Sequence, residues 1–310
     1  MNNKEALDKV ISSVNTVIKG KNDVVIKVLA AMIAGGHILM EDIPGVGKTT
    51  LAMAFAKSMG MDYKRVQFTP DVLPSDILGF SMYNSGTKEF EYRPGTVFCN
   101  LFLADEINRT SPKTQSALLE VMEEGTATVD GVTRKLPDPF VVIATENPYG
   151  SSGTQMLPES QLDRFMVCLS MGYPDHEDAV QILKGNAAEP LTGISEALSV
   201  EDLISLRVSV KDMYVKDDIY EYIVSLIEET RTNEMFSFGA SPRGTIACLK
   251  MAKAMAIIDG RDYVNALDVQ SVLGAALGHR VKLSQKSRAK GINTAKAMDE
   301  LIKAVKPPRS

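Results

Sequence analysis

The segment that most constrains this chain is residues 41–50, a glycine-containing loop set between an apolar run and a helical run. The residues HILM precede the loop and LAMAFAKSM follows it, an order that predicts strand, loop and helix. Backbone N–H groups in such a loop, together with the N-terminus of the helix, bind phosphate groups. Within the loop, Lys48 is placed to neutralise the β- and γ-phosphates of a nucleotide, and Thr49 to bind Mg²⁺ through its hydroxyl.

The loop departs at one position from the phosphate-loop pattern G-x-x-x-x-G-K-[ST], because Asp42 stands where the first glycine is expected. Aspartate tolerates the left-handed backbone conformation better than most residues, so a turn is still feasible there. The alternative interpretation is a surface turn with a chance lysine, which the flanking strand and helix disfavour. The residues of the loop that we predict to contact the nucleotide are Pro44, Gly45, Val46, Gly47, Lys48, Thr49 and Thr50.

The fold class follows from short apolar runs that alternate with helical patterns through about residue 175. This alternation is typical of a parallel sheet covered by helices on both faces. We therefore predict an αβα nucleotide-binding core over residues 1–175. The candidate strands are residues 37–40, 65–68, 100–104, 140–145 and 166–171.

Two segments interrupt this alternation. Residues 126–137 carry Asp130-Gly131 between β-prone arms, which is among the strongest short signals for a hairpin. Residues 79–96 are rich in glycine and aromatic residues, and we expect an insert there. Between the third and fourth strands, Ser111 with Pro112 starts a helix that Gly125 ends.

The second half of the chain reads differently. Beyond Pro174 the strand signals fade and apolar residues recur at helical spacing, which predicts a helical second domain over residues 176–310. The predicted helices are residues 203–214, 219–229, 245–258 and 267–277.

Two adjacent carboxylates, Asp105 and Glu106, end the apolar run LFLA, and Asn147 follows the next apolar run. Phosphoryl transfer needs a metal ion that bridges phosphate oxygens and a group that orients or deprotonates the attacking water. Asp105 suits the Mg²⁺ shell and Glu106 suits the water, which Asn147 could also hold. Acidic strand ends and Asn-Pro turns are common when taken singly. In this order after a phosphate loop, they predict a nucleotide hydrolase.

The order and the amino-acid sequences of these segments resemble those of the AAA+ superfamily, and most closely its MoxR branch. The similar segments are EDIPGVGKTTLA, QFTPDVLPSDILG, LFLADEINRTSPKTQSALLEVMEE, TATVDG, ATENP, LPESQLDRFM and SPRG. They run in one order from about residue 35 to 245, which makes the resemblance specific. It implies a P-loop NTPase core of the AAA+ type and a C-terminal all-helical lid domain, with the helix-2 insert of this branch near residues 79–96.

The resemblance also implies roles for the core residues. Lys48 and Thr49 match the Walker A motif, Asp105 and Glu106 match Walker B, and Asn147 matches sensor 1. Thr49 and Asp105 would then hold Mg²⁺, and Asp105 joins the nucleotide-binding set.

Two arginines complete the set that the resemblance implies. Arg164 within LDRF matches the arginine finger, which a neighbouring subunit supplies to stabilise transition-state charge. Arg243 within SPRG matches sensor 2, expected to report the γ-phosphate from a site between the core and the lid. The alternatives are a surface arginine paired with Asp163, for Arg164, and a helix-start residue, for Arg243.

The function implied is Mg²⁺-dependent ATP hydrolysis by a homo-oligomeric ring, six subunits by resemblance, that remodels or matures partner proteins. A von Willebrand A domain protein is the expected partner, and the insert and the hairpin are expected to face the ring centre and engage a client. The alternatives are a nucleic-acid-dependent AAA+ motor, a metal-chelatase-type ATPase subunit and a nucleotide switch that does not hydrolyse ATP. Glu106 speaks against the switch.

Charge and composition bear on which partners and which compartment we expect. The net charge is −5, whereas proteins that bind nucleic acid show a basic footprint, so we expect no stable nucleic-acid partner. Residues 280–310 are locally basic, which favours a solvated helix face over a surface for nucleic acid or anionic lipid. No run approaches the roughly 18 to 20 apolar residues of a membrane span, so we expect a cytoplasmic protein.

The cysteines and histidines are scattered in sequence, unlike the clustered ligands of metal sites. We expect the cysteines to be buried small hydrophobic residues and the histidines to have structural roles. They are Cys99, Cys168, Cys248, His37, His176 and His279.

Overall fold

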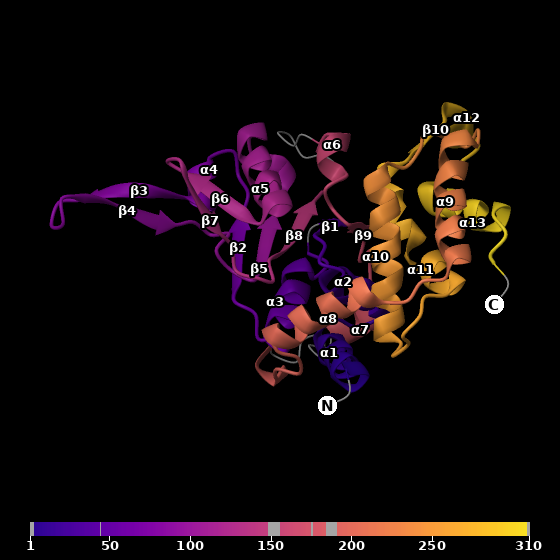
Figure 1. The fold of residues 1–310 in the computed structure, drawn as a ribbon, viewed down its shortest axis with the longest axis horizontal. Helices are drawn as coiled ribbons and strands as arrows, with labels where there is room; N and C mark the ends of the chain where they lie inside the picture. The colour runs from indigo at the N-terminus through magenta and orange to yellow at the C-terminus, as the bar shows by residue number, and fades with distance from the viewer. Residues whose placement is uncertain (1–2, 44, 148–155, 175, 184–190, 309–310) are drawn as a thin grey trace.

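A computed structural model describes residues 3–43, 45–147, 156–174, 176–183 and 191–308. Its centre is a parallel five-stranded sheet in the order β2-β5-β8-β1-β9 (Figure 1). The strands are β1 (Ile38–Glu41), β2 (Tyr63–Gln67), β5 (Leu101–Asp105), β8 (Val141–Glu146) and β9 (Val167–Leu169). Each overlaps one of the five predicted strands, so the parallel α/β core is confirmed.

Apart from the edge strand β2, the strands are largely apolar on both faces, because helices cover both faces of the sheet. Successive residues of a strand point to opposite faces, and along β5 Leu103 packs into one core cluster while Phe102 packs into the other. The first cluster contains residues of α1 (Asn3–Val17), α2 (Asn22–Ile33) and α3 (Lys48–Ser58). The second contains residues of α4 (Pro74–Leu78) and α5 (Pro112–Glu124), and α6 (Glu159–Leu162) packs beside it.

Helix α5 begins and ends where the sequence predicts. Ser111 is its N-cap and accepts a hydrogen bond from the Thr114 N–H, and Pro112 is its first residue. Gly125 ends it at a φ of 63°, a left-handed conformation that glycine adopts without steric cost.

The C-terminal part forms a lid that lies beside the β9 edge of the sheet (Figure 1). It is helical except for a two-stranded antiparallel sheet of β10 (Phe236–Phe238) and β11 (Lys282–Leu283), which the prediction of an all-helical lid omitted. The residues are too few and too mixed in polarity to show strand periodicity. Its main helices are α8 (Val200–Asp212), α9 (Asp217–Thr232), α10 (Pro242–Ile258), α11 (Ala266–Leu277), α12 (Gln285–Ala289) and α13 (Thr294–Ala304), preceded by α7 (His176–Leu183).

The division of the chain near residue 175 remains our proposal. Helix α8 packs against α2 of the core, and Arg207 of α8 donates a hydrogen bond to the Met32 carbonyl over 3.1 Å. The buried residues of the lid and those of the α1–α3 layer form one continuous cluster. Within the described residues, no helix is both long and apolar enough to cross a membrane.

Two hairpins extend from the core. The insert near residues 79–96 is the antiparallel pair β3 (Gly79–Asn84) and β4 (Glu89–Pro94), which projects away from the sheet as an arm (Figure 1). The second hairpin is β6 (Thr126–Val129) and β7 (Val132–Lys135). Its turn residues Asp130 and Gly131 have φ of 52° and 75°, as a two-residue turn of type I′ requires.

Candidate active site

The loop after β1 and the first turn of α3 form one wall of a cavity of about 420 Å³. Gly45 and Gly47 have φ of 85° and 95°, so the loop curves in a way that other residues adopt only with strain. Every described residue that lines the cavity belongs to the core. These residues are Asp42, Gly45, Gly47, Lys48, Thr49, Thr50, Arg65, Gln67, Asp105, Glu106 and Asn147.

Asp42, the residue that departs from the phosphate-loop pattern, has a structural role. It is 4% exposed, and its carboxylate accepts hydrogen bonds from Ser170 Oγ at 2.7 Å, Met171 N at 2.7 Å and Gly172 N at 2.9 Å. Asp42 is not among the described residues with positive φ, so the tolerance of aspartate for left-handed backbone does not explain its presence. Instead its side chain anchors the start of the loop to the segment after β9.

Lys48 lies where the loop meets α3, and its Nζ donates to the Asp42 carbonyl oxygen over 3.0 Å. Burial lowers the pKa of the Lys48 ammonium, and the carboxylates of Asp42, Asp105 and Glu106 oppose that shift. The ammonium therefore sits among acidic groups, in a cavity that glycine backbone opens. This combination is suited to a polyanion that arrives with a cation.

Asp105 ends β5 and faces the same cavity as Thr49. Its Oδ1 accepts from Thr145 Oγ at 2.7 Å, and its Oδ2 accepts from Arg65 Nη2 at 2.7 Å. A hydroxyl and a carboxylate are hard oxygen donors of the kind that Mg²⁺ takes together with substrate phosphates. The donor set of Thr49 and Asp105 therefore fits Mg²⁺.

Glu106 has a left-handed backbone, with φ 57° and ψ 50°, which is uncommon for a residue with a side chain and clusters at functional sites. Thr145 Oγ1 accepts from its N–H at 2.8 Å. Its carboxylate Oε2 accepts from Gln67 Nε2 at 2.8 Å and from Arg109 Nη1 at 2.7 Å. The side chain that we predict to act on water is thus held by two donors.

Sequence reasoning assigned no role to Arg65 and Gln67, which line the cavity from β2. The signal was present, because two polar residues alternate on a strand that was correctly predicted. Residues of alternate positions share a face of the sheet, and Gln67 lies in register with Asp105.

Of the remaining predicted residues, Asn147 follows β8 and lines the same cavity as Glu106. Thr50 lines it from α3, whereas Val46 is half-buried and packs against the hydrophobic core. Pro44 lies outside the described residues.

Glu146, adjacent to Asn147, is fully buried and lies in register with Glu41 on β1. Burial and next the neighbouring Glu41 carboxyl raise the pKa of Glu146 to about 8, against the lowering effect of Lys48. The shift favours the protonated, uncharged form of Glu146.

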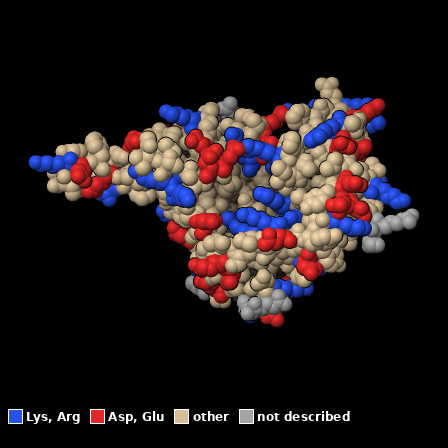
Figure 2. All heavy atoms as spheres, viewed as in Figure 1, with Lys and Arg blue, Asp and Glu red and all other residues tan. Residues whose placement is uncertain are grey.

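Arg164 and Arg243 do not line the cavity; both contact Glu123, near the end of α5. Arg164 Nε donates to Glu123 Oε2 at 3.0 Å, and Arg243 Nη2 donates to Glu123 Oε1. Arg243 was expected in a nucleotide site between this chain's own core and lid. Instead α10, which carries Arg243, begins beside α6, where Ser241 contacts Asp163. Arg243 therefore lies away from the cavity that holds Lys48. Figure 2 shows Lys and Arg side chains gathered around the hollow between core and lid.

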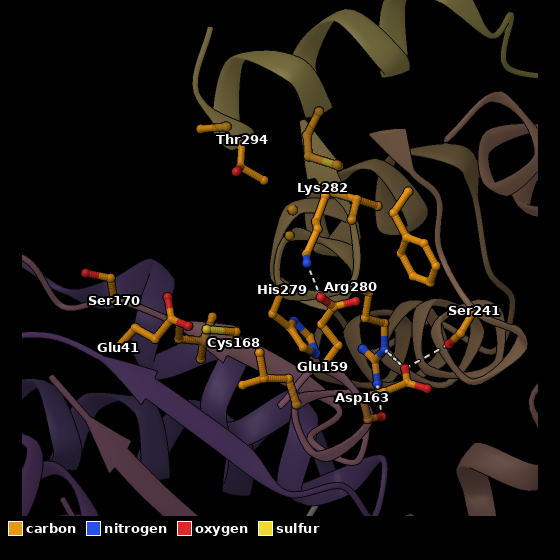
Figure 3. A pocket seen from close by; sticks show the side chains of 18 of the residues that line it. Glu41, Glu159, Asp163, Cys168, Ser170, Ser241, His279, Arg280, Lys282 and Thr294 are labelled. Atoms are coloured by element: carbon orange, nitrogen blue, oxygen red, sulfur yellow. Dashed lines mark hydrogen bonds and ion pairs between the residues drawn. The ribbon is translucent and has the colours of Figure 1, made fainter. Parts of the chain in front are cut away.

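A joint between core and lid lies next to Arg164. The Asp163 carboxylate Oδ1 accepts from Ser241 Oγ at 2.8 Å and from Arg280 Nε at 2.7 Å (Figure 3). Arg280 is 7% exposed and also donates to the main-chain oxygens of Asp163, Phe165 and Met166. Asp163 therefore pairs with the lid, not with Arg164. These residues border a larger cavity of about 850 Å³ between core and lid.

The histidines and cysteines have no metal cluster around them in the described residues. His37 accepts the Val142 N–H at Nδ1 and donates from Nε2 to the Met122 carbonyl, a structural role. All three cysteines are free thiols; Cys99 and Cys248 are buried and Cys168 is partly so.

Two family models match the chain. The ATPase family associated with various cellular activities (AAA) matches residues 37–167, which hold the cavity and the strands β1, β2, β5 and β8 of the sheet. The AAA lid domain matches residues 228–301.

Individual relatives cover nearly the whole chain. The protein YeaC of Bacillus subtilis is 48% identical over 97% of this chain and 95% of its own length. The chaperone MoxR1 of Mycobacterium tuberculosis is 36% identical over 98% of this chain and 82% of its own length. A crystal structure from Cytophaga hutchinsonii, named for a proposed ATPase activity, superposes with a TM-score of 0.90 at 34% identity, covering 99% of this chain and 96% of that one. The phosphate loop, the paired carboxylates and these relatives together make the chain a member of the MoxR family of AAA+ ATPases.

Proposed function

We propose that this chain hydrolyses ATP with Mg²⁺ in sites that form between neighbouring subunits of a ring. One observation carries the proposal. Lys48, Thr49, Asp105 and Glu106 surround a single cavity, whereas the two arginines implied by family resemblance lie together outside it. The cavity is therefore equipped to bind and attack a triphosphate, but Arg164 and Arg243 of the same subunit do not line it.

Within the cavity, the N–H groups of the loop and the Lys48 ammonium bind the phosphates. Glu106, held by Gln67 and Arg109, orients a water molecule and accepts its proton as the water oxygen bonds to the γ-phosphorus. The bond from that phosphorus to the bridging oxygen breaks, and ADP leaves. Asn147 holds the same water. Mg²⁺, held by Thr49 and Asp105, would supply neutralisation of charge on the phosphate oxygens.

The second half of the site comes from the next subunit. Arg164 and Arg243 are partly exposed, with side chains 32% and 48% accessible, so both can contact a neighbour. An arginine supplied in this way is worth about 10³ to 10⁵ in rate in related GTPases. Closure of the ring is needed for every subunit to receive this pair, and six subunits is the number that we propose from the family.

Two variants test the shared site. Glu106→Gln is expected to bind ATP and to lose turnover, because the amide cannot accept the proton. Arg164→Ala is expected to bind ATP as tightly as the parent and to lose the part of its ATPase activity that rises with protein concentration. Arg288, an exposed arginine of α12, provides a matched control as Arg288→Ala. Unchanged activity in Arg164→Ala, independent of protein concentration, would refute the shared site.

We further propose that the ring remodels partner proteins and that the β3–β4 arm contacts the client. The arm exposes large apolar side chains: Phe80 is 48%, Tyr83 53% and Phe90 74% accessible. Apolar side chains exposed together mark interaction sites. The partner that the family suggests is a von Willebrand A domain protein.

The arm is tested by capturing bound proteins on the Glu106→Gln variant in the presence of ATP. Phe90→Ser added to that variant should abolish capture, whereas Tyr220→Ser, at an exposed aromatic residue of α9, should preserve it. Equal capture by both would remove the arm from the proposal.

A further inference from the structure

One carboxylate joins the two candidate trans-acting arginines. Glu123 extends from the last turn of α5, and each of its oxygens accepts a hydrogen bond from a different arginine. Arg164 belongs to the core segment between α6 and β9, and Arg243 is the second residue of α10 in the lid. Glu123 is thus a point where side chains from the core and the lid meet.

The backbones on either side of this contact are already fixed by the Asp163 joint. Asp163 precedes Arg164, and Ser241, two residues before Arg243, donates to the Asp163 carboxylate as well as capping α10. The main-chain positions of the two arginines therefore do not depend on Glu123. The positions of their long side chains do depend on Glu123. A flexible arginine side chain loses rotamer entropy when it is held in one place, so a bonding partner is needed to keep it there.

Charge also requires a group of this kind. Two guanidinium groups that approach one site repel each other, and a carboxylate between them offsets that repulsion. The hydrogen bonds from Arg164, and secondarily from Arg243, hold the pKa of Glu123 below its usual range, so it stays ionised. Glu123 is 37% accessible, which leaves the three side chains open to an approaching phosphate.

The hydrogen bonds leave donors available. A guanidinium has five N–H donors. Arg164 uses Nε toward Glu123 and Nη1 toward the Ser160 carbonyl, and Arg243 uses Nη2 toward Glu123. Other N–H groups of both arginines can therefore bind phosphate oxygens while the contact with Glu123 persists.

We propose that Glu123 is a positioning residue that gathers Arg164 and Arg243 into one set and presents both to the nucleotide of the neighbouring subunit. This inference rests on the proposed shared site. Exposed ion pairs contribute little to stability, so loss of the carboxylate should change catalysis far more than folding.

The variant Glu123→Gln keeps the shape of the side chain and removes its charge. Turnover at saturating ATP should fall about ten- to a hundredfold, the usual effect of misplacing a catalytic group. The KM for ATP should change less than about twofold, because the variant's own cavity is intact. Glu124→Gln is the matched control, since Glu124 is the next residue, is exposed and has no ion pair in the described part of the chain. Normal turnover in Glu123→Gln would overturn the proposal.

Mixing subunits separates positioning in trans from damage within the subunit. Glu106→Gln subunits have an inactive site but intact arginines, whereas Glu123→Gln subunits have an intact site but misplaced arginines. Mixed rings should therefore be more active than the sum of the two separate preparations. A mixture of Arg164→Ala and Glu106→Gln subunits tests the shared site itself, and it should show the same gain in activity. Gain only in the Arg164→Ala mixture would refute the role of Glu123, and gain in neither would refute the shared site.

Discussion

Replacing Asp42 by glycine would restore the residue of the general phosphate-loop pattern, and yet we expect it to destabilise the core. The carboxylate accepts hydrogen bonds from Ser170 Oγ and from the N–H groups of Met171 and Gly172, in a position that is 4% exposed. Glycine would leave two main-chain donors without their acceptor. It would also give the unfolded chain more conformational freedom.

The magnitude can be worked from those three bonds. A hydrogen bond to a charged group contributes about 1.5–3 kcal/mol, and bonds that share one acceptor are less than additive. Water admitted to the vacated space recovers part of the loss, so we expect a net destabilisation of about 3–5 kcal/mol. For a domain of this size, that corresponds to a fall in Tm of about 10 °C.

Urea unfolding followed by far-ultraviolet circular dichroism measures this change, since the chain contains no tryptophan. Ser170→Ala removes one of the three donors and should cost about 1.5 kcal/mol in the parent, the low end of that range. In the Asp42→Gly background the same substitution should cost almost nothing, because its partner is already absent. A stability of Asp42→Gly within about 1 kcal/mol of the parent, or additive losses in the double variant, would refute the anchoring role.

The other predictions concern single positions. Because its pKa is raised to about 8, Glu146 keeps in the folded state a proton that the unfolded chain releases near pH 4.5. Its contribution to the free energy of unfolding is complete below pH 4.5 and is lost as the pH rises to about 8. Urea titrations from pH 5 to 8.5 should therefore show stability falling in the parent and a flatter profile in Glu146→Gln. Gly274→Ala in helix α11 should stabilise the chain by about 0.5–1 kcal/mol, since an added Cβ meets nothing within 4 Å. Gly244→Ala should destabilise it, because its Cβ would lie 2.9 Å from the Arg280 side chain, and thermal melting measures both changes. Gln67→Ala should lower kcat about tenfold with ATP affinity unchanged, because Glu106 loses one of its two donors; kinetics together with an equilibrium binding titration would expose an error as normal kcat.

The sequence allowed the sheet and several residues of the cavity to be predicted, because both depend on local patterns. Apolar runs identify buried parallel strands, and carboxyl ends of such strands meet at one edge, so Lys48, Asp105 and Asn147 were correctly expected to come together. The chemistry of these side chains follows from their type and order.

The surroundings of the two arginines could not be predicted in this way. Their contact with Glu123 joins α5 to the segment after α6 and to the first turn of α10. Arg164 lies 41 residues and Arg243 lies 120 residues from Glu123 in the chain. No periodicity encodes a contact of that kind. It depends on where the lid packs against the core, and the lid position rests on long-range contacts of Asp163, Ser241 and Arg280. The polar pair Arg65 and Gln67 was missed for a simpler reason, since polar residues on a strand are usually read as facing solvent.

The buried joint at Asp163 bears on how the two domains can be recombined. Arg280 reaches across the boundary to three main-chain oxygens and one carboxylate of the core, so it fits only a partner loop of this shape. A chimera that takes its lid from a relative without the matching aspartate would bury a guanidinium with no counter-charge, which is strongly destabilising. The lid of this chain is therefore transferable only together with the short core segment that it grips.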